Sequence, residues 1–229
     1  MKRFIRVALS DIRFQYAYGF YFLYLFVSLL YTAIIVLLPQ SWRHSARILA
    51  VFSDPAALGL FFMGAIILYE KGGNVLQSLA VSPVRTGEYV LSKMISIGIV
   101  SVFSGAAVCA ASGGKLHPFF FTGLFLGSCF FTLLGICFGT RITTINQFLI
   151  FTVPAEILIF VPAILYYFGY IPQFLTFHPG VLVLRLLDAH SPIAFLDTLL
   201  LGIQVGLLFI FTCRFSRTLF REEGKEAGE

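Results

Sequence analysis

Long apolar runs constrain this chain more than any other feature. Reading for stretches of about 20 apolar residues gives six candidates, and 27 of the 229 residues are phenylalanine. A soluble domain of this length has too little interior for a chain that is 59% hydrophobic and 12% charged. In lipid, helices satisfy their own backbone hydrogen bonds. The sequence therefore predicts an all-α membrane protein with six transmembrane helices, at Phe20–Leu38, Pro55–Tyr69, Tyr89–Ala111, Phe119–Phe138, Phe148–Tyr167 and Ile193–Cys213.

Two of these spans begin at or just after a residue pair typical of helix starts. Asp54 precedes the second span and Pro55 is its first residue, whereas Ser191 and Pro192 both precede the sixth. Asp and Ser favour the N-cap position, and Pro favours the first helical position. We therefore expect the second and sixth spans to begin at these pairs.

The basic residues predict the orientation of the chain. With both termini in the cytoplasm, twelve of the 16 Lys and Arg residues lie in inner segments, and only Arg43, Arg47, Lys115 and Arg185 lie outside. Such a bias marks the cytoplasmic side of a membrane protein. The net charge of +5 then reflects topology and lipid headgroups rather than nucleic acid. We expect a multi-pass protein of a bacterial inner (plasma) membrane, with residues 214–229 as a cytoplasmic tail.

Residues 1–18 have a helical period and predict an amphipathic interfacial helix on the inner leaflet. No small-residue cleavage site follows the first apolar run, so a cleaved signal peptide is not expected. The alternative is an ordinary basic flank before the first span. The expected apolar face holds Ile5, Ala8, Leu9, Ile12 and Tyr16, and the polar face holds Arg6, Ser10 and Arg13.

The outer segment 169–191 is apolar for a loop and contains the stretch "GVLVLRLLDAH". It is too short to cross a bilayer and return. We expect a re-entrant or surface-lying helix that covers the outer side. Arg185 and Asp188 are three residues apart and are expected to pair on that helix.

No enzyme motif is present in the sequence. The four cysteines, all in apolar runs, are expected to be buried and reduced, and the spacing of the four histidines matches no metal site. The stretch "SGGKL" at Ser112–Leu116 lacks the first glycine and the final Ser or Thr of a phosphate-binding loop. We therefore expect no catalytic, metal or cofactor-binding residue on this chain.

Glu156 is the polar residue with the highest expected cost, because it lies inside the fifth span between Pro154 and Pro162. It lines a translocation path or carries a proton. Alternatively, its carboxylate bonds to backbone freed by Pro162, or to Gln147 or Asn146. Two further candidates for the path, Asp197 and Gln204, lie in the sixth span.

Glycines repeat at spacings of four in two spans. Small residues at this spacing let helices approach closely, and we expect most of these contacts to lie within one chain. The glycines are Gly123, Gly127, Gly135 and Gly139 in the fourth span, and Gly202 and Gly206 in the sixth.

The second cytoplasmic segment predicts a short surface helix over residues 72–82. Gly72 and Gly73 separate it from the second span, and Pro83 ends it. Its apolar side consists of Val75, Leu76 and Leu79. A surface helix with one apolar side binds either the membrane or a partner protein.

The order of residues around this segment resembles a known signature. It reads Glu70, Gly73, Leu76, Leu79, Pro83, Glu88-Tyr89 and Lys93, and it is similar to the stretch between the second and third spans of ABC-2-type (type V exporter-like) permeases. The preceding "FSDPAALGLFFMGAIILYEK" resembles their small drug-exporter branch. Asn74 departs from the signature, because many members carry Thr there.

The resemblance implies the transmembrane subunit of an ATP-driven exporter. Residues 72–82 would be the coupling helix that docks on a separate ABC ATPase subunit, which would hold ATP and Mg. Thr140–Asn146 would make a second contact, and a second permease, identical or a sister chain, would complete the pore. The cargo would be a hydrophobic or amphipathic drug, peptide or lipid. The coupling residues would be Glu70, Gly73, Val75, Leu76, Leu79, Pro83 and Arg85.

Two other functions are alternatives to an ATP-driven exporter. A secondary transporter could use Glu156 as a proton carrier, without any ATPase. An intramembrane enzyme is less supported, because it needs paired catalytic groups at membrane depth and only Glu156 plainly lies there.

Overall fold

The computed structural model describes the chain apart from residues 1, 74, 76–83, 171–172, 189–192 and 227–229. The side chains of residues 2–5, 54–58, 173–174 and 218–226 are also outside the description. Within the described residues the protein is helical and contains no strand. The elements are α1 (Lys2–Ala17), α2 (Phe20–Leu37), α3 (Gln40–Gly72), α5 (Thr86–Ala111), α6 (Pro118–Arg141), α7 (Ile145–Tyr167), the 3-10 helix η1 (Gln173–Phe177), α8 (Pro179–Leu187) and α9 (Ala194–Glu226).

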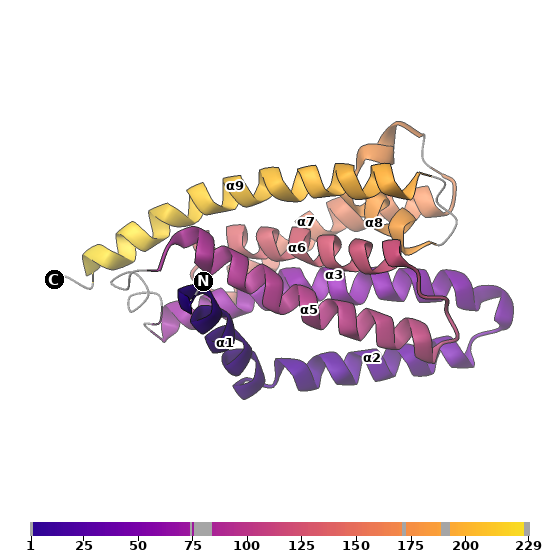
Figure 1. Ribbon diagram of the computed structural model, residues 1–229, viewed down its shortest axis with the longest axis horizontal. Helices are drawn as coiled ribbons and strands as arrows, with labels where there is room; N and C mark the ends of the chain where they lie inside the picture. Colours follow the sequence, from indigo (N-terminus) through magenta and orange to yellow (C-terminus); the bar gives the residue numbers. More distant parts are fainter. Residues whose placement is uncertain (1, 74, 76–83, 171–172, 189–192, 227–229) are drawn as a thin grey trace.

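The long helices lie side by side, and both chain termini are at one end of the bundle (Figure 1). We call this end the terminal end and the other the opposite end. Helices α2, α3, α5, α6, α7 and α9 each run between the two ends. This arrangement agrees with the prediction that both termini lie on the same side of a membrane.

Five of the described helical segments are long and apolar enough to cross a membrane: α2, α5, α6, α7 and Ala194–Arg217 of α9. They match five of the six predicted spans. The remaining predicted span, Pro55–Tyr69, lies within α3. From Arg47 to Glu70 this helix rises by roughly 35 Å, close to the ~30 Å thickness of a bilayer core.

The predicted start of the second span is wrong. α3 does not begin at Asp54 and Pro55 but at Gln40, and it continues through both positions for 33 residues. The extra N-terminal half has a buried apolar face made by Ile48, Val51 and Phe52, so packing extends the helix beyond the predicted cap. α9 begins at Ala194, and the predicted Ser191–Pro192 start of the sixth span lies outside the described residues.

α6 is the most buried of the five candidate spans and packs against α3, α5, α8 and α9. Its glycines bring the neighbours close. A Cβ on Gly123 would lie 2.7 Å from the Leu186 Cβ in α8, and one on Gly135 would lie 2.6 Å from the Leu60 carbonyl in α3. The prediction of close packing within the chain is therefore confirmed for α6. It is wrong for Gly202 and Gly206 of α9, because nothing lies within 4 Å of a Cβ built at either.

The predicted outer helix is α8, and it lies inside the protein rather than on its surface. Seven of its nine residues are buried, and it packs against α3, α6, α7 and α9. Buried leucines and valines face those neighbours. This placement fits a re-entrant segment, whose backbone is covered by protein at membrane depth.

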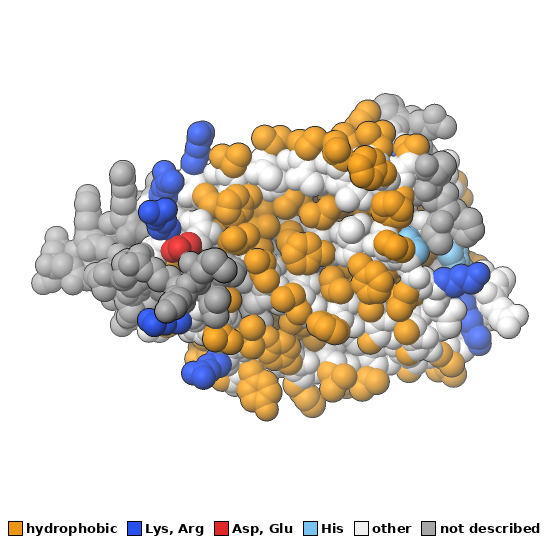
Figure 2. Space-filling model, viewed as in Figure 1, with side chains coloured by type: hydrophobic (Ala, Val, Ile, Leu, Met, Phe, Trp, Pro, Cys, Tyr) orange, Lys and Arg blue, Asp and Glu red, His pale blue; other side chains and the backbone are white. Residues whose placement is uncertain are grey.

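Hydrophobic side chains cover the middle of the face seen in Figure 2, and Lys and Arg side chains lie toward its two ends. Such a band is expected where the middle of a bundle meets lipid and its ends meet water.

α1 lies across the terminal end, and Gly19 in the left-handed conformation (φ 73°) forms the turn into α2. Leu9, Ile12 and Tyr16 of its predicted apolar face are exposed, whereas Asp11 and Gln15 are buried against the protein. A helix is thus present over the predicted residues and exposes apolar side chains, and its position on the inner leaflet stays a prediction. Its polar contacts to the bundle were not predicted.

Candidate functional site

A group of buried polar side chains occupies the terminal end, where α1, the last turn of α3 and the first turns of α5 meet. We call it the Lys93 cluster, made up of Asp11, Glu70, Tyr89, Ser92 and Lys93. Each of the five is at most 7% exposed. These residues come from three helices, so the cluster joins elements that are far apart in the sequence.

Lys93 lies between two carboxylates. Its Nζ is 3.0 Å from Asp11 Oδ1 and 2.5 Å from Glu70 Oε1. The remaining carboxylate oxygens each accept a hydroxyl hydrogen bond, from Ser92 to Asp11 (2.6 Å) and from Tyr89 to Glu70 (2.6 Å). Lys93 also lies 4.8 Å from the centre of the Tyr89 ring.

The cluster holds its charges by pairing them. A buried ion costs several kcal/mol unless partners surround it, and here each carboxylate oxygen has a donor. Two carboxylates against one ammonium leave a formal surplus of one negative charge. Removing Lys93 would leave both carboxylates uncompensated, whereas neutralising one carboxylate would remove the surplus.

The residues of the cluster lie on both sides of the segment 74–83 in the sequence. Glu70 precedes the segment 74–83, and Tyr89 and Lys93 follow it. On the far flank, α5 begins at Thr86 after Arg85, whose backbone N–H donates to the Glu88 carboxylate (3.0 Å). The two flanks of the segment are therefore fixed to each other and to α1.

Lys71 makes a second connection at this end. Its Nζ donates to the carbonyls of Thr140 (2.9 Å) and Ile142 (3.0 Å), where α6 ends. A cation suits the carbonyl end of a helix. This contact ties the end of α3 to the loop between α6 and α7.

Comparison with known proteins agrees with this architecture. The chain is 25% identical to a fluoroquinolones export permease protein from two strains of Mycobacterium tuberculosis, CDC 1551 / Oshkosh and H37Rv. The alignment covers 96% of this chain and 95% of the relative. No family model matches the chain.

The chain is a distant, full-length homologue of an export permease. The five described helices that are long and apolar enough to cross a membrane agree with that relationship. The homology is also consistent with a transporter subunit that carries out no catalysis itself.

The predicted coupling residues are placed as follows. Glu70 belongs to the Lys93 cluster, Gly73 caps the end of α3, and Arg85 precedes α5 on the surface. Val75 is exposed. Leu76, Leu79 and Pro83, and with them most of the predicted helix 72–82, lie outside the described residues.

The three candidate path residues lie in different settings. Glu156 is half-buried on α7, and no hydrogen bond or salt bridge joins its carboxylate to another described residue, including Gln147 and Asn146. Asp197 is 1% exposed and pairs with Arg185 of α8 at 3.2 Å. Gln204 donates to the Phe177 carbonyl of η1 at 2.7 Å. Asp197 and Gln204 therefore hold α9 to its neighbours at the opposite end.

The predicted pair of Arg185 and Asp188 is not formed. Arg185 reaches across to Asp197, and Asp188 lies 3.6 Å from His44 of α3. Asp188 follows the last residue of α8 in extended conformation, so the two side chains do not share a helical face.

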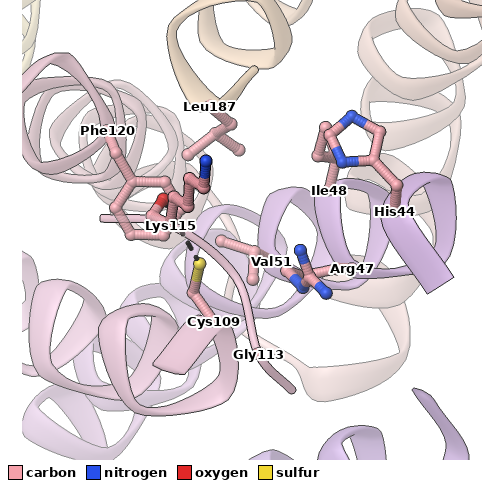
Figure 3. Close-up of a pocket in the computed structure, with 9 residues that line it drawn as sticks. All are labelled: His44, Arg47, Ile48, Val51, Cys109, Gly113, Lys115, Phe120 and Leu187. Carbon is pink, nitrogen blue, oxygen red and sulfur yellow. Dashed lines mark hydrogen bonds between the residues drawn. The ribbon is translucent and has the colours of Figure 1, made fainter. Parts of the chain in front are cut away.

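A cavity of about 280 Å³ lies at the opposite end, between α3, α6, α8 and the loop after α5 (Figure 3). Its lining includes Arg47, Cys109, Lys115 and Phe120. Arg47 bonds through Nε to the Ser112 hydroxyl (2.9 Å) and through Nη2 to the Ser112 carbonyl (2.8 Å). These bonds fix the loop after α5 to α3 beside the cavity.

Three of the four histidines, His44, His117 and His178, lie in the described part of the chain. His117 caps α6 by accepting from the Phe120 N–H (3.2 Å), and His178 precedes α8. Burial lowers the pKa of His178, although a backbone hydrogen bond to Leu158 opposes this. His190 lies outside the described residues. The four cysteines are free, and no three possible metal ligands come together in the described part of the chain.

The sequence analysis named Tyr89 and Lys93 as part of the signature and did not name Asp11 or Ser92, and it predicted none of the four as a site residue. A signal was available for Lys93, which falls inside the predicted third span although a charge there requires a partner. Its carboxylate partners lie 23 and 82 residues away. Sequence spacing alone does not reveal such a contact.

Proposed function

We propose that this chain is the transmembrane subunit of an ATP-driven exporter, and that its cargo is an amphipathic, drug-like molecule. The full-length homology to a fluoroquinolones export permease supports export and a cargo of this class. A separate ATPase subunit would supply ATP hydrolysis, with ATP and Mg bound there. A second permease chain, identical or sister, would complete the pore.

The observation that carries this proposal is the Lys93 cluster. It joins both flanks of the segment 74–83 to each other and to α1, through side chains that are almost fully buried. Force applied to that segment reaches three helices through charge-assisted bonds instead of being lost in a flexible loop. Lys71 extends the same connection to the loop containing Thr140–Asn146, the second proposed ATPase contact.

This proposal places the terminal end in the bacterial cytoplasm, where ATP is available. Closing of the ATPase subunits would push on the segment 72–82 and on the neighbouring loop. The stroke would tilt α3 and α5 together, because the Lys93 cluster joins them, and so change access to the cargo site.

Docking of the ATPase is tested by co-purification. Leu76→Asp and Leu79→Asp place a charge on the proposed docking side, and each is expected to abolish recovery of an ATPase with the tagged permease. Leu116→Asp is the matched control, because Leu116 is 44% exposed at the opposite end. Membrane insertion should be equal for all three variants. Full ATPase recovery with Leu76→Asp and Leu79→Asp would refute the docking role.

One observation favours a second candidate. The half-buried Glu156 carboxylate has no partner among the described residues, and a group of this kind could carry a proton. A proton-coupled transporter would export cargo from proteoliposomes under a pH gradient without ATP, and Glu156→Gln would remove that coupling. Export that depends on ATP, and that is unchanged in Glu156→Gln under a pH gradient, would exclude this alternative.

A further inference from the structure

A groove of about 410 Å³ lies between α2 and α5. Its volume is within the range of ~300–1,000 Å³ that is typical of small-molecule sites. Along α5 it extends from Ser96 to Ala107, which corresponds to roughly 16 Å of helix rise. That is about half of a ~30 Å bilayer core, and Ile12 of α1 borders the groove at the terminal end. On α5 the groove ends four residues before Ala111, the last residue of the helix, so it spans the middle of the bundle rather than one end.

The groove opens sideways. Leu25 and Phe103 on its rims are 58% and 73% exposed, whereas Tyr24 and Ser96 in its floor are 5% and 3% exposed. Both rims belong to candidate membrane spans. A molecule dissolved in the adjacent lipid would reach the floor without first crossing water.

Hydroxyl groups lie at two levels of this otherwise apolar lining. Near the terminal end, Tyr21 donates to Gln15 Oε1 (3.2 Å), and Gln15 Nε2 donates to the Ser96 hydroxyl (2.9 Å). Farther along, the hydroxyls of Ser28 and Ser104 bond to each other at 2.7 Å. No lining side chain is charged.

We infer that this groove binds the cargo. The occupant is a drug-sized amphipathic molecule whose apolar aromatic body lies against Tyr24, Leu25 and Phe103. Its hydrogen-bonding end reaches the Tyr21 and Ser96 hydroxyls. A molecule with a net charge is disfavoured, because the lining offers no counter-ion for an unbalanced desolvated charge. This inference rests on the proposed function, because it names where the exported molecule binds.

The groove is joined to the Lys93 cluster. Gln15 lies one helical turn after Asp11 on α1, and Ser96 lies three residues after Lys93 on α5 and donates to the Lys93 carbonyl (3.1 Å). A cargo that competes for the Tyr21 and Ser96 hydroxyls disturbs the bonds of Gln15 on α1 and Ser96 on α5, two of the three helices that the cluster joins. Occupancy of the groove and the position of the proposed coupling segment are thereby linked.

The test is binding of norfloxacin, an aromatic fluoroquinolone, to the purified full-length chain, measured by equilibrium dialysis in detergent. Ala107→Trp fills one end of the groove and is expected to weaken binding about tenfold. Phe103→Ala removes a rim side chain and is expected to weaken it about threefold. Ala33→Trp is the matched control, because Ala33 is exposed on α2 outside the groove. It should leave both norfloxacin binding and the melting temperature unchanged.

Three results would overturn the inference. The first is no norfloxacin binding to the unaltered chain, and the second is binding that Ala107→Trp and Phe103→Ala leave unchanged in folded protein. The third is a photoreactive phospholipid that labels Tyr24 or Phe103 and is not displaced by norfloxacin, which would make the groove a lipid site. The binding assay needs no ATPase, so it fails independently of the co-purification experiment.

Discussion

The two ends of the molecule each contain a buried ionic site, and the sites differ in charge balance and surroundings. At the terminal end, Lys93 lies between Asp11 and Glu70, with one negative charge in surplus. At the opposite end, Arg185 faces Asp197 one to one. The opposite-end pair lies beside α6 and α8, whose backbones approach closely at Gly123.

This difference indicates that the ends are held together in different ways. Tight packing of glycines fixes α8 against α6, and the Arg185–Asp197 pair adds to a contact that shape already defines. At the terminal end, charge pairing joins α1, α3 and α5 in addition to the apolar packing of α3 against α5. We therefore expect the largest losses of stability from changes in the Lys93 cluster.

The strongest prediction concerns Lys93. Lys93→Met leaves two buried carboxylates without their cation, and we expect the free energy of unfolding to fall by about 3–5 kcal/mol. The measurement is SDS-induced unfolding of the purified chain. Lys115→Met is the control, because Lys115 is exposed at the opposite end, and its effect should be within about 0.5 kcal/mol.

The same unfolding measurement tests whether stability lost in Lys93→Met is restored by removing the two carboxylate charges. In Lys93→Met, adding Asp11→Asn and Glu70→Gln removes both uncompensated charges and should restore part of the lost stability. If the triple variant is no more stable than Lys93→Met, loss of packing rather than of charge pairing explains the effect.

The next prediction concerns packing in α6. In Gly135→Ala the new Cβ would lie 2.6 Å from the Leu60 carbonyl, and we expect a loss of about 1–3 kcal/mol in the free energy of unfolding. Gly206→Ala of α9 meets nothing within 4 Å, and it should stabilise the helix by up to about 1 kcal/mol. Equal effects of the two substitutions in the same SDS titration would contradict the close approach of α6 to α3.

The smallest expected losses of stability come from neutralising one carboxylate in each of the two ionic sites. Asp197→Asn leaves Arg185 without a counter-charge, and we expect a loss of about 1.5 kcal/mol. Asp11→Asn removes the surplus charge and leaves the Glu70–Lys93 pair intact, so its cost should be under about 1 kcal/mol. The order is read from paired unfolding curves. A larger loss for Asp11→Asn would show that the surplus charge is compensated by groups outside the cluster.

Much of the fold follows from residue pattern alone. Runs of apolar residues predicted five spans that match described helices, and the period of residues 1–18 predicted α1. These signals are local, because a helix in lipid needs only its own residues to satisfy its backbone. The start of α3 was missed because the apolar face of its N-terminal half is interrupted by Arg43, His44 and Arg47.

The candidate site was less predictable. The order of the residues that flank the segment 74–83 resembles a known signature and pointed to this region. No partner was predicted for Asp11. Its role depends on α1 folding back across the terminal end onto α5, a tertiary contact over 82 residues. The partner of Arg185 was wrongly predicted for the same reason, because proximity in sequence suggested Asp188 while the fold brings Asp197 closer.

The Lys71 ammonium, at the end of α3, donates hydrogen bonds to the carbonyls of Thr140 and Ile142, at the end of α6. This contact holds the end of α3 to the end of α6 at the base of the bundle, although the bonded residues are 69 and 71 positions apart in the sequence. Under the proposed function, a protein that pushes on one of these helix ends also moves the other. Neutralising the ammonium is then expected to let the two ends move separately.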